Sequence, residues 1–188
     1  HGPNYNATRN GRVFVAAGVT IRTAILAAHA TNGNNTLWNP LGSGRVLSIL
    51  KLRLAYVSGN NAPGSLAWNI TESTGAGLGP TGGAILTGAS VPVRNAAGGL
   101  GVDSKAIWIP HVTATAAPTF TAAPVYHRPI GLSMFTGVAA TADAPWVWGE
   151  NYEGDNLIMP GTALTLCTVQ ATTTSLLRVT IVFEEIDE

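Results

Sequence analysis

The chain has 188 residues, no net charge and only 11% Asp, Glu, Lys and Arg, whereas soluble globular chains typically carry about 25%. This length suits a single domain with one sizeable core, and without any run of about 18 apolar residues the sequence predicts no membrane-spanning helix. The cations are neither clustered nor interleaved with aromatic residues, which makes nucleic acid a poor candidate partner. So sparsely charged a surface favours being covered by copies of the chain or by another protein.

Charge is divided unevenly along the chain. Eight of the ten Lys and Arg residues lie within residues 1–105, and eight of the ten Asp and Glu residues lie within 106–188. One interpretation is that strands from the two halves interleave in one fold and neutralise each other. The other is that the charges act between molecules, either head to tail between subunits or through a basic arm on an acidic partner. The sequence leaves both open.

In chain order, residues 1–20 are predicted to form an N-terminal arm outside the core, and residues 21–188 a single domain. The segment RVFVAAG has the apolar pattern of a strand, whereas TIRTAILAAHAT at 20–31 fits a strand almost as well as a helix. The stretch NPLGSG at 39–44 combines residues that are typical of tight turns. We expect this turn to set the register with which the next strand enters its sheet.

Residues 45–59, RVLSILKLRLAYVSG, form a long predicted strand. Alternation gives it one nearly all-apolar face, which is predicted to point into the core and consists of Val46, Ser48, Leu50, Leu52, Leu54 and Tyr56. The opposite face carries Lys51 and Arg53. We predict that this second face points to solvent or to a partner.

Further β-type segments follow, most of them bounded by Gly, Pro or Asn: 64–73, 83–88, 105–110, 145–150, 162–171 and 175–187. Residues 163–185 are predicted to form a β-hairpin with a Thr-rich turn. The loops at 74–104 and 113–129 are too long for tight hairpins, and no helix stands out. Many short strands joined by long loops favour an all-β fold, a jelly-roll-type β-sandwich with an extended N-terminal arm.

Motifs for catalysis or metal binding are weak in this sequence. The glycine-rich stretch GAGLGPTGG lacks the Lys-Ser/Thr ending of a phosphate-binding loop. Glu150, Glu153 and Asp155 could form a ligand or Ca²⁺ loop, although the residue order of an EF-hand is absent. A carboxylate pair for glycoside hydrolysis could be drawn from Asp143, Glu150, Glu153 and Asp155. The neighbouring Trp146 and Trp148 are the only hint of a sugar platform. We therefore predict a non-enzymatic protein without catalytic residues, resident metal or cofactor.

Two stretches, LWNPLGSGRVLSILKLRLAYVSG at 37–59 and LIMPGTALTLCTVQATTTSLLRVTIVFEEID at 157–187, resemble structural proteins of tailed-bacteriophage virions. In those proteins an Asn-Pro-x-Gly-Ser-Gly turn leads into a long strand, and a Pro-Gly hairpin closes a jelly-roll or tumour-necrosis-factor-like domain. The resemblance covers about a third of the chain. It implies a homotrimer that decorates a capsid as a cement protein, or that sits on the tail as a fibre or receptor-binding part.

Capsid decoration on the virion exterior is the favoured expectation. The expected partners are two further copies of the chain, which complete a homotrimer, and the major capsid protein. Neither nucleic acid nor membrane is expected as a partner. Arg9, Arg12 and Arg22 lie in an N-terminal segment without acids, and we expect them to attach the arm to an acidic capsid surface. The alternatives are receptor binding on the tail through the loops at 74–104 and 113–129, and a carbohydrate-binding or carbohydrate-active domain centred on PWVWGENYEGDN.

Overall fold

The structure is a computed structural model that describes residues 4–17, 35–58, 64–72, 93–97, 103–109, 120, 124–133, 147–168 and 176–188. These residues form α1 (Tyr5–Arg9), β1 (Val13–Ala17), β2 (Thr36–Trp38), β3 (Arg45–Ser58), β4 (Gly64–Glu72), β5 (Arg94–Asn95), β6 (Ile107–Ile109), β7 (Val125–Ser133), β8 (Val147–Ile158), β9 (Thr162–Thr168) and β10 (Leu176–Asp187). Apart from the short helix α1, every regular element is a strand. The described chain is therefore all-β, as the sequence predicts.

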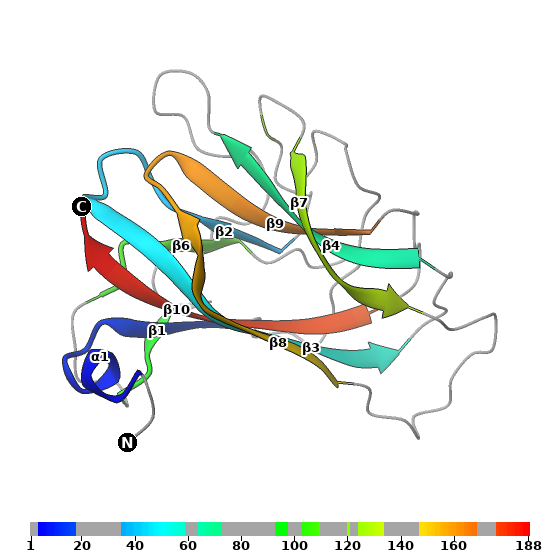
Figure 1. Ribbon diagram of the computed structural model, residues 1–188, viewed down its shortest axis with the longest axis horizontal. Helices are drawn as coiled ribbons and strands as arrows, with labels where there is room; N and C mark the ends of the chain where they lie inside the picture. Colours follow the sequence, from blue (N-terminus) through cyan, green and yellow to red (C-terminus); the bar gives the residue numbers. More distant parts are fainter. Residues whose placement is uncertain are drawn as a thin grey trace.

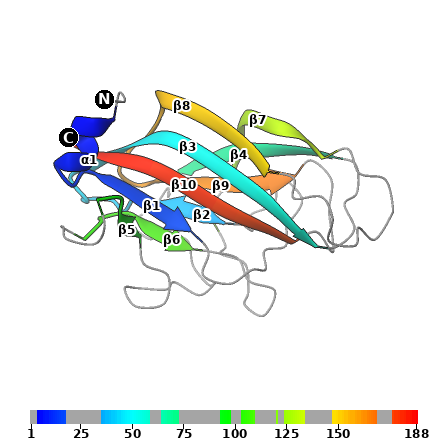
Figure 2. The same ribbon diagram turned by 90° about the horizontal axis from the view of Figure 1, so that it is seen from below.

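The strands form two five-stranded antiparallel sheets, which lie one over the other (Figures 1 and 2). Sheet A has the order β5-β1-β10-β3-β8, and sheet B has the order β6-β2-β9-β4-β7. Most consecutive strands belong to different sheets, so the chain crosses repeatedly from one layer to the other. Neighbours within a sheet are consequently distant in sequence, and Val13 of β1 lies opposite Glu184 of β10.

One buried apolar cluster is shared by the two sheets. Phe14 of β1 and Phe183 of β10 stack within it, with ring centroids 5.9 Å apart, and Trp108 and Leu164 contribute from sheet B. Burial of each such large apolar side chain stabilises the fold by about 1.5–3 kcal/mol relative to exposure. The core therefore lies between the sheets and depends on side chains from both.

The predicted faces of β3 are wrong in its first half. Leu47 and Ile49 are buried in the shared core, although simple alternation places them on the same face as Lys51 and Arg53, which was predicted to point outward. The reason is a β-bulge: the ladder with β10 skips Leu50, and the ladder with β8 is interrupted at the same point. One extra residue reverses the alternation, so Leu52 and Leu54 point inward as predicted.

The predicted hairpin at 163–185 is also wrong. β9 pairs with β2 and β4 in sheet B, whereas β10 pairs with β1 and β3 in sheet A. Both strands exist where the sequence placed them. Alternation identifies a strand but carries no information about which strand it pairs with.

The N-terminal segment is part of the packed structure. Phe14 and Ala16 of β1 lie in the shared core, so the expectation that residues 1–20 lie outside it is wrong for residues 13–17. Ala7 of α1 packs on the outer face of sheet A against Val13, Leu50 and Val182. The bulge at Leu50 supplies one of these contacts, because it turns that side chain away from the core.

Several predicted segments lie outside the described residues, namely 20–31, 83–88 and most of the two long loops. The predicted loop at 113–129 is too long at its end, because β7 begins at Val125. In the part of the chain that the structure describes, no helix is long and apolar enough to cross a membrane.

Candidate functional site

The NPLGSG turn is held by the side chain of Asn39, which is fully buried. Its amide nitrogen donates to the carbonyl oxygens of Arg45 at 2.7 Å and Ile158 at 2.9 Å, and its amide oxygen accepts from the Ser43 hydroxyl at 2.7 Å. The Asn39 backbone N–H donates to the carbonyl of Thr162 at 3.0 Å. One side chain thus joins the start of β3 to the end of β8, and its backbone adds the start of β9.

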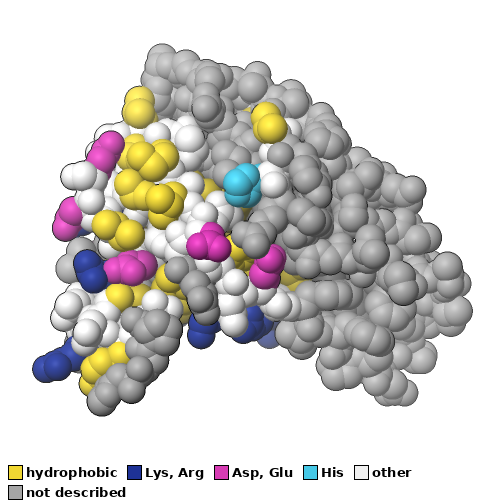
Figure 3. Space-filling model, viewed as in Figure 1, with side chains coloured by type: hydrophobic (Ala, Val, Ile, Leu, Met, Phe, Trp, Pro, Cys, Tyr) yellow, Lys and Arg dark blue, Asp and Glu magenta, His cyan; other side chains and the backbone are white. Residues whose placement is uncertain are grey.

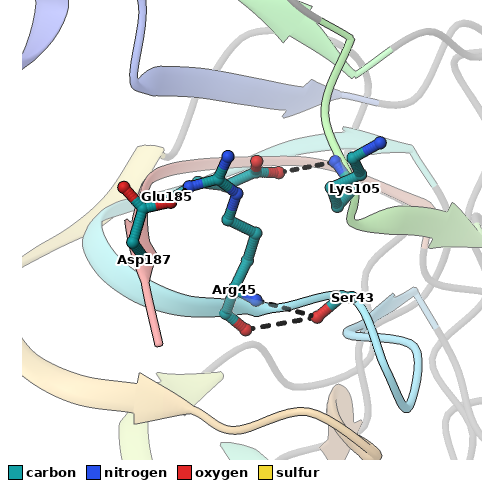
Figure 4. Close-up of polar contacts among 5 residues, drawn as sticks. All are labelled: Ser43, Arg45, Lys105, Glu185 and Asp187. Atoms are coloured by element: carbon teal, nitrogen blue, oxygen red, sulfur yellow. Dashed lines mark hydrogen bonds and ion pairs between the residues drawn. The ribbon is translucent and has the colours of Figure 1, made fainter.

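The ends of the chain meet through ion pairs at this same end of the molecule. Arg12, just before β1, pairs with Glu184 of β10 at 3.0 Å. Arg45 at the start of β3 reaches Asp187 near the end of β10 (Figure 4). In both pairs the cation comes from the basic half and the acid from the acidic half. For these residues the uneven charge distribution is neutralised within one molecule.

Glu185 serves a different purpose from its charged neighbours, because it points inward and is only 6% exposed. Its Oε1 accepts from the Ser104 hydroxyl at 2.6 Å. The same oxygen accepts from the Lys105 backbone N–H at 2.8 Å (Figure 4). The Ala106 N–H lies 3.3 Å from the same oxygen. The carboxylate therefore fixes the segment that enters β6, which is a structural role.

Exposed apolar side chains gather beside this ion-paired end (Figure 3). Four exposed side chains and the half-buried Val46 make up what we call the apolar stripe: Leu41, Val46, Leu157, Met159 and Ile186. Val46 lies opposite Ile186 in the β3–β10 ladder, and Leu157 lies opposite Ser48 on the other side of β3. Leu41 lies next to Gly161, where an added Cβ would be 3.3 Å from its Cδ1. Contiguous exposed apolar groups of this kind are typical of interaction sites.

Three cations occupy the outer face of sheet A further along the same strands. We call them the basic triangle: Lys51 and Arg53 of β3 and Arg178 of β10. Arg53 lies opposite Thr180, and Arg178 lies opposite Ala55, so the two arginines are diagonal neighbours, about 7–8 Å apart at most. Lys51 precedes Arg53 by two residues on the same face. Among the described residues none of the three cations forms an ion pair.

Arg53 is held flat against the edge strand β8. Its Nη1 donates to the carbonyl oxygens of Leu52 at 2.8 Å and Glu150 at 3.2 Å, and its Nη2 donates to Asn151 Oδ1 at 3.1 Å. Gly149 makes this position possible, because a Cβ there would lie 2.6 Å from Nη1. The guanidinium group is therefore fixed before any partner arrives, which lowers the entropy cost of binding an anion.

The residues predicted to attach an arm are not gathered in one place. Arg9 is exposed on α1, Arg12 is paired with Glu184, and Arg22 lies outside the described residues. Lys51 and Arg53, predicted on the outward face of a strand, are exposed and half-buried, respectively.

The residues of the predicted ligand loop, Glu150, Glu153 and Asp155, lie within strand β8. Glu150 lies opposite the core residue Leu52 and is half-buried, whereas Asp155 is exposed and precedes the inward-facing Asn156. These two carboxylates therefore point to opposite sides of sheet A. The side chain of Glu153 lies outside what the structure describes, and within the described part no three His, Cys, Asp or Glu side chains are grouped to hold a metal ion. The Ca²⁺ loop stays a prediction.

Sequence reasoning did not single out Arg178 or the apolar stripe. A usable signal was present for Arg178, because alternation in LLRVTIVFEEID places it on the face away from Val179, Ile181 and Phe183. The stripe depends on the register between β3, β8 and β10, which the sequence does not give. No protein-family model, curated protein sequence or solved structure matches this chain.

Proposed function

We propose that the chain is a non-enzymatic structural protein of a tailed-bacteriophage virion, built as a jelly-roll-type β-sandwich. The observation that carries the proposal is the strand order, with β1-β10-β3-β8 together in one sheet and β2-β9-β4-β7 in the other. Two Greek keys wound into a pair of sheets give this order, and viral capsid domains are among the proteins that use it. In this interpretation β5 and β6 extend the two sheets beside β1 and β2.

Within the virion we propose capsid decoration by a homotrimer that sits on the major capsid protein. The apolar stripe, and a basic triangle that forms no ion pair with a described residue, support a role in assembly on so sparsely charged a chain. Covering such surfaces with another protein removes apolar area from water and gives the cations acidic partners. Several copies held together also bind a lattice with avidity, so no single contact to the capsid has to be strong.

The N-terminal arm has a reduced part in this proposal. Arg12 already has an internal partner in Glu184, so its charge is largely offset. Arg9 is exposed on α1 and pairs with no acid in the described part of the chain. Electrostatic attachment to an acidic capsid surface therefore rests on Arg9 and Arg22.

Immunogold electron microscopy tests the proposed function directly. Antibodies raised against the purified chain are applied to particles of the virus that encodes it. We expect label spread evenly over the heads. Label confined to the tail would support the tail alternative instead, and particles without label would contradict a virion protein.

Charge reversal tests the arm. The variant Arg9→Glu/Arg22→Glu is expected to lose binding to particles depleted of the protein, as measured by co-sedimentation. The matched control is Arg12→Glu/Glu184→Arg, which exchanges the two charges of an existing pair and should bind like the unmodified chain. Full binding by the first variant would contradict the arm and leave the virion assignment to the labelling experiment.

A further inference from the structure

Three members of the apolar stripe, Val46, Leu157 and Ile186, lie on the outer face of sheet A together with the basic triangle, and Leu41 and Met159 lie in the adjoining turns. β10 connects them, since Ile186 belongs to the stripe and Arg178 to the triangle. The eight-residue separation along an extended strand corresponds to roughly 26 Å. Each surface therefore occupies its own end of the same face, far enough from the other for two different neighbours to be contacted.

The free charges at the two ends are opposite in sign. Beside the stripe, Asp155 precedes Leu157 by two residues and Glu188 follows Ile186 by two; both acids are exposed. Neither forms an ion pair with any described residue. The Glu188 backbone is held, because its N–H donates to the carbonyl of Gly44 at 3.3 Å. At the other end are the three cations of the triangle, which also form no ion pair with a described residue.

The triangle is suited to receive a carboxylate. Arg53 uses both Nη1 hydrogens and one Nη2 hydrogen within the molecule, which leaves Nε–H and the second Nη2 hydrogen as donors. Two such donors on one guanidinium match the two oxygens of a carboxylate. Lys51 and Arg178 add charge around them, and small or aliphatic residues of the same face, such as Ala17 and Val15, offer apolar contact.

We propose that the chain associates head to tail with a second copy of itself, the apolar stripe with Asp155 and Glu188 of one subunit lying on the basic triangle of the next. In the proposed contact each copy uses its stripe on one neighbour and its triangle on another, so the contact is heterologous and repeats from copy to copy until a ring closes. A three-membered ring is the expected product. This inference deepens the proposed function, on which the choice of a trimer rests, by naming the surfaces that assemble it.

Two charge-reversed variants provide the test, with mass measured by light scattering and affinity by sedimentation over a range of concentrations. The first, Lys51→Glu/Arg178→Glu, turns the triangle acidic and leaves Arg53 in place. The second, Asp155→Lys/Glu188→Lys, turns the stripe end basic. Each alone should weaken self-association at least about tenfold, because like charges then face each other. An equimolar mixture should associate again, because each reversed surface matches the other variant.

A matched control separates this contact from a general charge effect. Lys105→Glu/His127→Glu changes the net charge in the same direction and almost as far as the first variant does, at exposed positions before β6 and on β7 of sheet B, and should associate like the unmodified chain. A third variant, Leu157→Ser/Met159→Ser, removes apolar surface without a charge change and should also weaken association at least about tenfold. If circular dichroism shows that a charge-reversed variant does not fold, this apolar variant takes its place in the test.

Three results would overturn the inference: a monomer at every concentration tested, reversed variants that associate normally, or a mixture that stays dissociated. None of these results bears on whether the chain is a virion protein, which the labelling experiment tests separately. Gold label on phage heads together with normal association of the reversed variants would reject the interface and keep the function. Ring formation without any label on particles would do the opposite.

Discussion

β8 and β10 are both twelve-residue strands of sheet A, yet they are built on different terms. β10 lies between β1 and β3, and its alternate residues Val179, Ile181 and Phe183 fill the core. β8 pairs with β3 along one side and lies at the end of the sheet order. Its ladder breaks between Asn151 and Asn156, where residues 152–155 face the single residue Leu50.

The comparison separates two tasks within one sheet. The central strand has regular alternation because both of its neighbours and the core constrain it. The edge strand tolerates Gly149, carboxylates and an interruption, because only one ladder depends on it. Interruptions also discourage unwanted pairing of sheet edges between molecules. Stability is therefore expected to depend on β10, and contacts between molecules on side chains around β8 and the outer face.

Removal of a core side chain from β10 should break the fold most severely. Phe183→Ala deletes a ring that is fully buried and stacked on Phe14, and should lower the free energy of unfolding by about 3–5 kcal/mol. Urea denaturation at low protein concentration measures this. The matched change at the edge, Leu157→Ala, should alter the same quantity by no more than about 0.5 kcal/mol. Equal losses would contradict the division between the strands.

Loss of the Asn39 side-chain hydrogen bonds should have the second-largest effect on the free energy of unfolding. Asn39→Ala leaves the carbonyl oxygens of Arg45 and Ile158 without their side-chain donor, and should cost about 1–3 kcal/mol of unfolding free energy. Ser43→Ala, which removes a hydroxyl but leaves both carbonyls bonded to Asn39, should cost less. Urea midpoints for the two variants provide the comparison, and a harmless Asn39→Ala would show that the turn does not need this side chain.

Loss of the space that Gly149 leaves for Arg53, which we call the cradle, should lower the free energy of unfolding by less. Gly149→Ala places a Cβ where the guanidinium lies, so Arg53 must swing away and lose its contacts to β8, at a cost of about 1 kcal/mol. In an Arg53→Met background the same alanine should cost much less, because the clash is gone. A double-mutant cycle of thermal unfolding measures this coupling, and additive effects would argue against the cradle.

The surface ion pairs should matter least. Arg12→Gln removes the pair with Glu184, whose arginine side chain is 48% exposed, and should lower stability by about 0.2–1 kcal/mol. The difference from the unmodified chain should shrink in about 1 M salt, where screening is strong. A loss that is both larger and independent of salt would mean that Arg12 contributes by packing rather than by charge.

The sequence predicted the strands better than their partners. The expected strand at 175–187 is confirmed as β10, Leu176–Asp187, and the long strand from Arg45 is confirmed as β3. Alternation sufficed for these because each has a core-facing side. It failed for the first half of β3, because no residue type announces the bulge at Leu50, and for the hairpin, because pairing is decided by the whole fold.

The candidate surfaces were partly within reach of the sequence. Alternation alone places Lys51 and Arg53 on the side away from Leu52 and Leu54, since all four follow the bulge. Arg178 joins them only when the β3–β10 register is known, and Leu157 reaches the stripe only through the β3–β8 register. Surfaces assembled from three strands depend on long-range pairing, which local patterns do not encode.

The position of β10 also has a consequence for how the protein acquires its shape. β1 and β3 precede most of the described strands, yet β10, which joins them, comes after all the other strands that the structure describes. Until β10 leaves the ribosome, β1 and β3 expose apolar side chains and unpaired edges. Folding of sheet A is therefore expected to wait for translation of β8 and β10. It should also be slow, because the strands that pair are so distant in sequence. A nascent chain stopped before Leu176 should be a substrate for chaperones and proteases.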